Sequence, residues 1–183
     1  MSEAPELPPR MSLAAFLEWD DGTDARYELL QGRIVAMAPS SDRHAAIVIK
    51  LGTALSRRLK PPCLAYVEGG ASPATADDTY FLPDVMVSYT PPTGAPIVRD
   101  PLLVSEILSP STRTHDRGNK LPLYQEMPSV MHVLLLDQDR RRVEHFRRSA
   151  RGWEQTTHLA GGTLALDALG FEVAVDEIYE GIA

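Results

Sequence analysis

The segment 102–108 restricts the fold of this chain more than any other, because a glutamate interrupts a nearly continuous apolar run. It reads Leu-Leu-Val-Ser-Glu-Ile-Leu, a pattern typical of a central strand that is buried on both faces. Carboxylates are rarely buried unless they are paired or bind a metal ion. The segment therefore predicts that Glu106 either has a functional partner inside the domain or lies near a strand end and bonds to an arginine.

Helix and strand patterns alternate around this segment. Apolar residues at 47, 48, 51, 55 and 59 predict an amphipathic helix over 43–59, and Gln31-Gly32 predicts a hairpin turn between strands 27–30 and 33–37. Further helices are expected after Ser12, over 117–126 and at 175–179. Further strands are expected over 63–67, 81–89, 130–137, 142–148 and 153–158. This order predicts an α/β (α+β) domain with a mixed sheet.

Length and composition exclude several classes of protein. The 183 residues fit one domain, expected over 11–183 after a polar, proline-containing leader at 1–10. A single cysteine, Cys63, excludes an internal disulfide and a multi-cysteine zinc site. No apolar run approaches the ~20 residues of a membrane helix, and the polar N-terminus is unlike a secretory signal. We therefore expect a cytoplasmic protein that does not contact a membrane.

The charge balance does not by itself favour nucleic-acid binding. The formal net charge is −7, whereas strong binding depends on neutralising phosphates. An acidic protein can still meet nucleic acid through a local basic patch. Six arginines on the expected hairpin near residues 140–151 form either such a patch or a solvated surface that resists edge aggregation.

Three further charged residues could join Glu106 in one site. Asp84 follows Pro83 directly before an apolar strand, which places it either at the rim of the sheet or in a common Pro-Asp turn. Lys120 lies on the expected helix after Glu106, either as a counter-charge or as an exposed lysine paired with Asp116. Glu28 lies in the first hairpin, and its alternative is the solvent face of an alternating strand.

Carboxylates gathered around a lysine have a chemical logic. Oxygen ligands suit hard divalent cations such as Mg²⁺ or Mn²⁺. Such a cation lowers the pKa of bound water and offsets the charge of a phosphate, and a nearby lysine stabilises the transition state. A zinc site is not favoured because the histidines are scattered, and no Gly-x-Ser-x-Gly motif marks a serine nucleophile.

The pattern of these residues resembles the Uma-type family of restriction-endonuclease-like proteins, within the PD-(D/E)XK nuclease superfamily. The resemblance runs from about residue 11 to the C-terminus, and its most specific part is Glu-Ile-Leu-Ser-Pro-Ser-Thr at 106–112 after Pro-Asp-Val at 83–85. Other shared positions are Tyr27-Glu28-Leu29, Gly32, Met37-Ala38-Pro39, His44, Asp116, Lys120, Tyr124 and the apolar segment 133–137.

The resemblance implies a restriction-endonuclease-like core with flanking helices and a Mg²⁺ or Mn²⁺ site built from Asp84 and Glu106. It implies catalytic roles for Asp84, Glu106, Lys120 and Glu28 in hydrolysing phosphodiester bonds of nucleic acid, with DNA as the expected substrate and a homodimer as the expected assembly. His44 and Asp116 are accessory candidates, and His44 alternatively bonds only to the backbone.

One departure from the superfamily pattern is important. Leu108 stands where a lysine is expected two residues after the second acid, and Lys120 is the residue that would replace it. The rival hypothesis is therefore a non-catalytic, oligomeric binding module that retains the nuclease fold. Convergence of Glu28, Asp84, Glu106 and Lys120 in one cleft would favour the enzyme.

Overall fold

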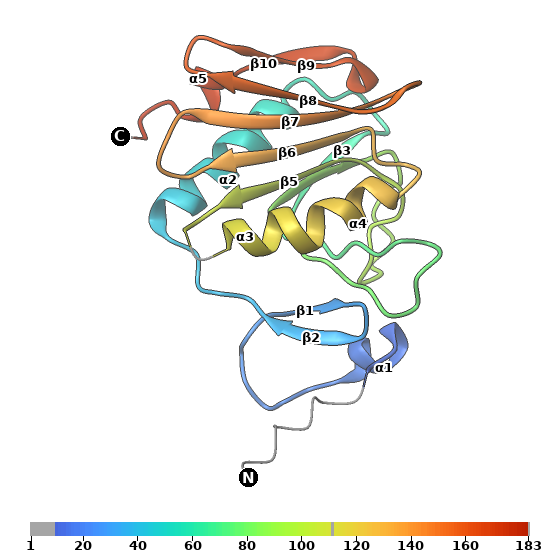
Figure 1. Cartoon of the computed structure of the whole chain (residues 1–183). Coiled ribbons are helices and arrows are strands. Elements are labelled where there is room, and N and C mark those ends of the chain that lie inside the picture. The colour runs from blue at the N-terminus through green and yellow to red at the C-terminus, as the bar shows by residue number, and fades with distance from the viewer. Residues whose placement is uncertain (1–9, 111, 183) are drawn as a thin grey trace.

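A mixed six-stranded sheet forms the centre of the computed structural model, which describes residues 10–110 and 112–182 (Figure 1). The neighbouring strands β5 and β6 are parallel, and every other adjacent pair is antiparallel. Apart from residue 10, the expected leader lies outside the described residues. In spatial order the strands are β3 (Leu64–Val67), β4 (Val85–Ser88), β5 (Pro101–Leu108), β6 (His132–Asp137), β7 (Arg142–Ser149) and β8 (Gly152–Leu159).

The α/β (α+β) expectation is confirmed, and so is the central, buried position of the segment 102–108. All six residues of β6 and seven of the eight in β5 are buried. Alternation along β5 directs Leu103 and Ile107 into one hydrophobic cluster, whereas Val104 and Leu108 enter another on the opposite face. Glu106 shares the face of Val104 and Leu108, so its carboxylate enters the second layer.

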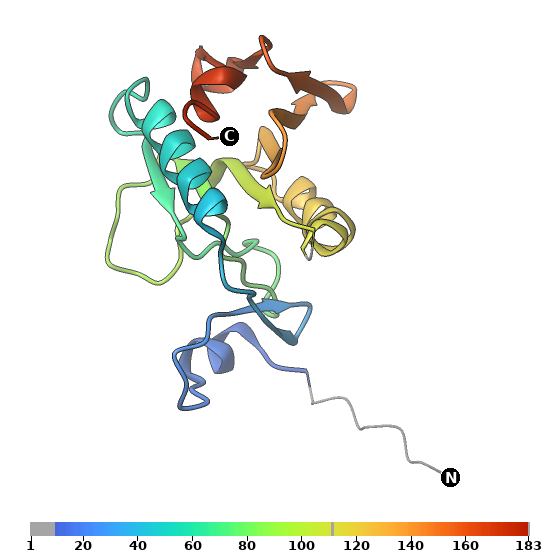
Figure 2. The same cartoon turned by 90° about the vertical axis from the view of Figure 1, so that its left-hand side faces the viewer.

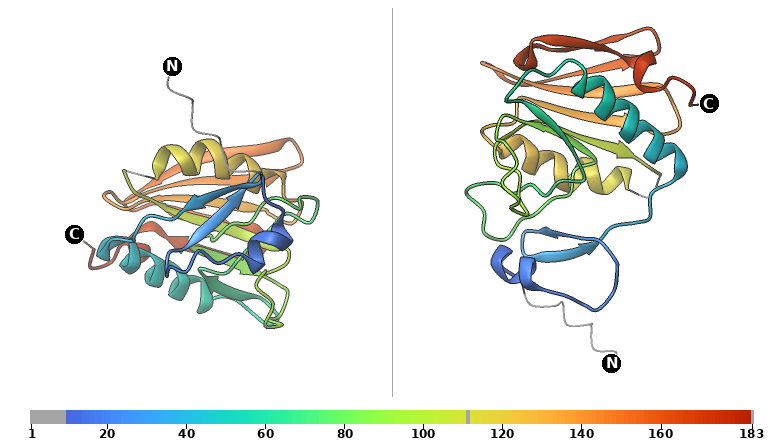
Figure 3. Two further views of the ribbon diagram at one scale, coloured as in Figure 1. Left: turned by 90° about the horizontal axis from the view of Figure 1, so that it is seen from below. Right: turned by 180° about the vertical axis from the view of Figure 1, so that it is seen from behind.

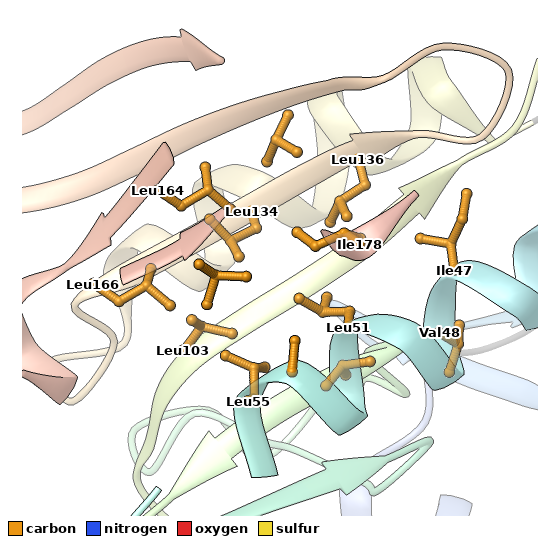
Figure 4. Packing of buried hydrophobic residues seen from close by; sticks show 14 of the residues in the cluster. Ile47, Val48, Leu51, Leu55, Leu103, Leu134, Leu136, Leu164, Leu166 and Ile178 are labelled. Atoms are coloured by element: carbon orange, nitrogen blue, oxygen red, sulfur yellow. The ribbon is translucent and has the colours of Figure 1, made fainter. Parts of the chain in front are cut away.

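Helices cover both faces of the sheet (Figure 2). The long helix α2 (Asp42–Ser56) packs on one face, and its Leu51 and Leu55 meet Leu103 and Leu134 of the central strands (Figure 4). A helix of three parts covers the other face: α3 (Arg113–His115), a π-helical turn (Asp116–Lys120) and α4 (Leu121–Glu126). Two short helices, α1 (Leu13–Glu18) and α5 (Val175–Ile178), and a 3₁₀ turn (Asp167–Leu169) complete the described set. Within the described residues, none of these helices is long and apolar enough to cross a membrane.

The π-helical turn has a cause in the sequence. Pro122 has no N–H, and its ring clashes with a carbonyl four residues earlier in a regular helix. The preceding N–H, that of Leu121, donates to the carbonyl of Asp116, which lies five residues back and not four as in a regular α-helix. The expected helix over 117–126 thus begins earlier, at Arg113, and contains a wider turn.

Two hairpins extend the domain. The first pairs β1 (Tyr27–Leu30) with β2 (Arg33–Ala36) around Gln31 and Gly32, which both have positive φ as an expected hairpin turn requires. It lies below the six-stranded sheet in Figure 1, so the view from below looks onto it (Figure 3). The second pairs β9 (Thr163–Leu166) with β10 (Phe171–Ala174) and was not predicted, because its strands are short. Its Leu164, Leu166 and Val173 complete the cluster on the α2 face.

The contrast between two positions of α2 tests this packing. Leu51 is fully buried, whereas Ile49 is 64% exposed on the same helix. Leu51→Ala should lower the free energy of unfolding by about 2–5 kcal/mol because it leaves a cavity. Ile49→Ala should change it by less than about 0.5 kcal/mol. Urea denaturation of both variants measures the difference, and equal losses would contradict the packing of α2 on the sheet.

Candidate active site

The two central acids come from adjacent antiparallel strands. Val85 of β4 pairs with Ser105 of β5, so Asp84 and Glu106 occupy neighbouring register positions at the same end of the sheet. The Oδ2 atom of Asp84 accepts the backbone N–H of Ile107 at 2.6 Å, which fixes the first acid against the strand of the second. Both residues are buried, with 7% and 3% of their surface exposed.

Lys120 brings three carboxylates together. Its Nζ lies 2.9 Å from Oε1 of Glu28, 3.2 Å from Oε1 of Glu106 and 3.7 Å from Oδ1 of Asp116. The ammonium is buried, and so are all three acids. The exposed-lysine alternative is therefore wrong, although the expected pairing with Asp116 is present. Among the residues that the structure describes, Glu106 pairs with a lysine and not with an arginine.

Glu28 reaches the site because the β1–β2 hairpin is hydrogen-bonded to the rest of the domain. Leu29 and Tyr80 exchange two backbone hydrogen bonds, of 2.9 and 2.6 Å. The N–H of Leu82 then donates to Oε1 of Glu28 at 2.8 Å. Glu28 is 2% exposed, so the solvent-face alternative is wrong.

His44 is the partner of Asp84. The helix α2 begins after Ser41, whose hydroxyl accepts the His44 N–H, and the His44 ring lies 3.0 Å from Oδ1 of Asp84. Burial lowers the pKa of His44, but the hydrogen bond to the Asp84 carboxylate and the negative charges of Asp84, Glu68 and Asp116 together raise it more, and the net shift is upward. The ring bonds a carboxylate, which the backbone-only alternative does not include.

These side chains line one cleft of about 900 Å³. His44 and His115 contribute to its wall, as do Met37, Ala38 and Pro39 after the first hairpin. The charged side chains of the cleft are acidic in excess: Asp24, Glu28, Glu68, Asp84, Glu106 and Asp116 against Arg26 and Lys120. A polyanion therefore meets a repulsive field unless a cation compensates it.

Burial and mutual repulsion perturb the titration of the site. Burial raises the pKa of Glu106 well above its usual range; Lys120 opposes the rise, and Asp84, Asp116 and Glu28 add to it. Burial likewise raises the pKa of Asp116. Burial lowers the pKa of Lys120, yet the carboxylates of Glu106, Glu28 and Asp116 outweigh it and the net shift is upward. Lys120 consequently stays charged across the physiological range.

Sequence reasoning did not assign a role to Tyr124, which belongs to this cluster. Its hydroxyl donates to Oε1 of Glu106 at 2.5 Å, and the ring is fully buried. Burial, followed by the charges of Glu106 and Glu28, raises the pKa of Tyr124 well above its usual range, so the phenol keeps its proton. Its position four residues after Lys120, on the same helix face, was the available signal.

The donor set suits a hard cation. Within residues 10–110 and 112–182, no three His, Cys, Asp or Glu side chains are arranged as a complete metal cage. Mg²⁺ rarely needs one, because it usually binds through one or two carboxylates and keeps several waters. Asp84 and Glu106 supply two such carboxylates in an acidic cleft, so the residues fit the ion.

Several arginines near residues 140–151 pair with acids outside the cleft. Arg141 pairs with Asp176, Arg142 with Glu144, and Arg147 with both Glu154 and Asp167. Arg148 donates to backbone carbonyls at the end of α4 and in the α4–β6 connection, and its guanidinium lies over the Trp153 ring. For these four arginines the contacts favour the solvated-surface alternative over a phosphate-facing patch.

Comparison with known proteins identifies the family of the chain. Residues 13–176 match the model of the Uma2 family, described as "Putative restriction endonuclease". The chain belongs to the Uma2 family. Two uncharacterised Synechocystis proteins are similar to it: slr1290 is 29% identical over all of this chain and 99% of its own length, and sll1609 is 27% identical over 75% and 81%.

A solved structure supports the fold of this Uma2 chain. The crystal structure of a putative nuclease of DUF820 from Anabaena variabilis superposes with a TM-score of 0.76, covering 92% of this chain and 97% of the other. Sequence identity is 17%, so the likeness concerns the fold. The restriction-endonuclease-like expectation is confirmed at this level.

Removing the lysine of this Uma2 site should be costly. Lys120→Met leaves three buried carboxylates without their cation and should lower the free energy of unfolding by about 3–5 kcal/mol at neutral pH. Lys50, paired with Glu180 at the surface, provides the control, and Lys50→Met should cost less than about 1 kcal/mol. Urea denaturation compares them. Similar small losses would mean that the cluster is solvated.

The raised pKa of Glu106 gives stability a direction with pH. The folded chain binds the extra proton, so the free energy of unfolding falls as pH rises from the usual 4.5 through the folded pKa. Glu106→Gln removes this dependence. The raised pKa values of Asp116 and His44 contribute to the pH dependence of both wild type and the variant. We expect a shallower fall in melting temperature between pH 5 and pH 8 for Glu106→Gln in EDTA. The exposed Glu172→Gln should follow wild type, and parallel curves for all three would contradict the assignment.

Proposed function

We propose that this chain is a divalent-metal-dependent nuclease that hydrolyses phosphodiester bonds, with DNA as the expected substrate. The observation that carries the proposal is the convergence of Glu28, Glu106 and Asp116 on the buried ammonium of Lys120, beside Asp84 in one cleft. Buried charges are expensive unless they are paired. A cluster with more buried acids than bases supports a site that is completed by a cation.

Asp84 and Glu106 would hold Mg²⁺ or Mn²⁺. When bound, the ion would supply Lewis-acid chemistry by acidifying water and offsetting phosphate charge. Asp84 is suited to this role because Ile107 and His44 fix its carboxylate. Asp116 adds negative charge at the same place and strengthens the attraction for a cation.

Lys120 would act as an electrostatic stabiliser. Its raised pKa keeps it charged, so it does not serve as the general base. As water attacks phosphorus and the bond to the leaving oxygen breaks, the ammonium would offset the growing negative charge. Glu28 would orient Lys120, because Leu82 and Lys120 both bond to its Oε1.

His44, beside Asp84, would take part in proton transfer. Its ring borders the cleft and contacts Asp84 through one nitrogen. Histidine is the side chain that most readily exchanges a proton near neutral pH. We assign it an accessory role in moving the proton from attacking water or to the leaving oxygen.

The non-catalytic binding module remains the second candidate because Leu108 occupies the usual lysine position. Leu108 is 1% exposed and packs in the core, so it contributes nothing to the site. The placement of Lys120 within 3.2 Å of Glu106 supports the enzyme, since a different element supplies the missing amine to the same carboxylate. A homodimer with two clefts is part of the proposal for duplex DNA.

Calorimetric titration with Mn²⁺ tests the metal site directly. Wild type should bind the ion, and Glu106→Gln should lose most of the binding heat because one of two ligand carboxylates is gone. Glu172→Gln, an exposed substitution of the same type, should bind as wild type does. Equal binding by Glu106→Gln and wild type would contradict the proposed ligand.

Cleavage assays on single- and double-stranded DNA and RNA then separate the two candidates. The nuclease predicts products that require Mg²⁺ or Mn²⁺ and disappear in Glu106→Gln. Metal binding with no cleavage of any of these substrates would favour the binding module instead.

A further inference from the structure

Both hydrogen bonds that the described residues make to the Glu106 carboxylate end on one oxygen. Oε1 accepts the Tyr124 hydroxyl at 2.5 Å and the Lys120 ammonium at 3.2 Å. The two donors are four residues apart on the helix that covers this face of the sheet, so they approach from the same side. Oε2 is left as the oxygen available to a ligand.

We infer that Tyr124 is a positioning residue for metal binding: its hydroxyl holds Oε1 of Glu106 so that Oε2 is presented to the cation. This inference rests on the proposed function, because it takes Glu106 as a metal ligand. Carboxylates that bind metals are generally held by further hydrogen bonds, and loss of such a partner weakens metal affinity.

The packing of Tyr124 makes its hydroxyl a fixed donor. The ring is fully buried, and its centroid lies 4.7 Å from the centroid of the Phe81 ring, at an interplanar angle of 58°. Lys120, in contrast, divides its ammonium among Glu28, Glu106 and Asp116. Tyr124 therefore supplies the bond that is specific to Glu106 and sets the rotation of that carboxylate.

A second buried tyrosine offers a matched control. Tyr179 is 2% exposed, and its single hydroxyl proton lies between two acceptors, the carbonyl oxygens of Asp137 at 2.8 Å and Arg142 at 3.0 Å. It belongs to the hydrophobic cluster on the opposite face of the sheet from Tyr124. A Tyr→Phe substitution removes one buried, hydrogen-bonded hydroxyl at either position. Of the two hydroxyls, that of Tyr124 contacts the proposed metal ligand Glu106, and that of Tyr179 does not.

Calorimetry with Mn²⁺ on folded wild type, Tyr124→Phe and Tyr179→Phe tests the inference. Tyr124→Phe should bind Mn²⁺ about 10–100-fold more weakly than wild type, the usual effect of losing a partner of a metal ligand. Tyr179→Phe should keep wild-type affinity, although both variants lose thermal stability. Unchanged affinity in Tyr124→Phe, or equal losses in both, would overturn the positioning role.

A measurement on wild type covers the case in which Tyr124→Phe does not fold. In protein labelled with 3-fluorotyrosine, Mg²⁺ should shift the fluorine resonance of Tyr124 and leave that of Tyr179 in place. A Tyr124 resonance that does not respond while metal binds would overturn the inference. If wild type binds no Mn²⁺ at all, the proposed metal site itself fails, and the role of Tyr124 falls with it.

Discussion

The ion pairs of Lys120 are the interaction on which the arrangement of this domain depends. One buried ammonium joins Glu28 of the first hairpin, Glu106 of the central sheet and Asp116 of its own helix. Three parts of the chain thereby meet at one atom. Because each acid would be costly to bury alone, the hairpin, sheet and helix are stable in this arrangement only together.

Much of this could be predicted from the sequence, since the strongest signals were local. The apolar run around Glu106 identified the central strand and the unusual carboxylate, and the spacing of residues 47–59 identified α2. Glu28 was harder to place, because its burial depends on the backbone pairing of Leu29 with Tyr80, fifty-one residues away along the chain. Tyr124 has the pattern of an ordinary core residue, and only the tertiary structure reveals its hydroxyl contact.

The proposed role of Glu106 implies a conflict between stability and function. An apolar residue at position 106 would fit the alternation along β5. It would also avoid the cost of burying a carboxylate, the same burial that raises the pKa of Glu106. The chain keeps the acid and surrounds it with further acids, so the surrounding clusters of leucine, isoleucine and valine must compensate. Such a cost is expected at functional positions, where proteins depart from local rules.

The supply of the amine from a helix, with Leu108 in the usual lysine position, also has a consequence for biosynthesis. Glu28 leaves the ribosome early, Glu106 much later, and Lys120 and Tyr124 last. A nascent chain therefore carries its acids without their cation until the helix 113–126 has emerged and docked. If the proposed chemistry is correct, an incomplete chain would be inert toward the nucleic acid that surrounds it during translation.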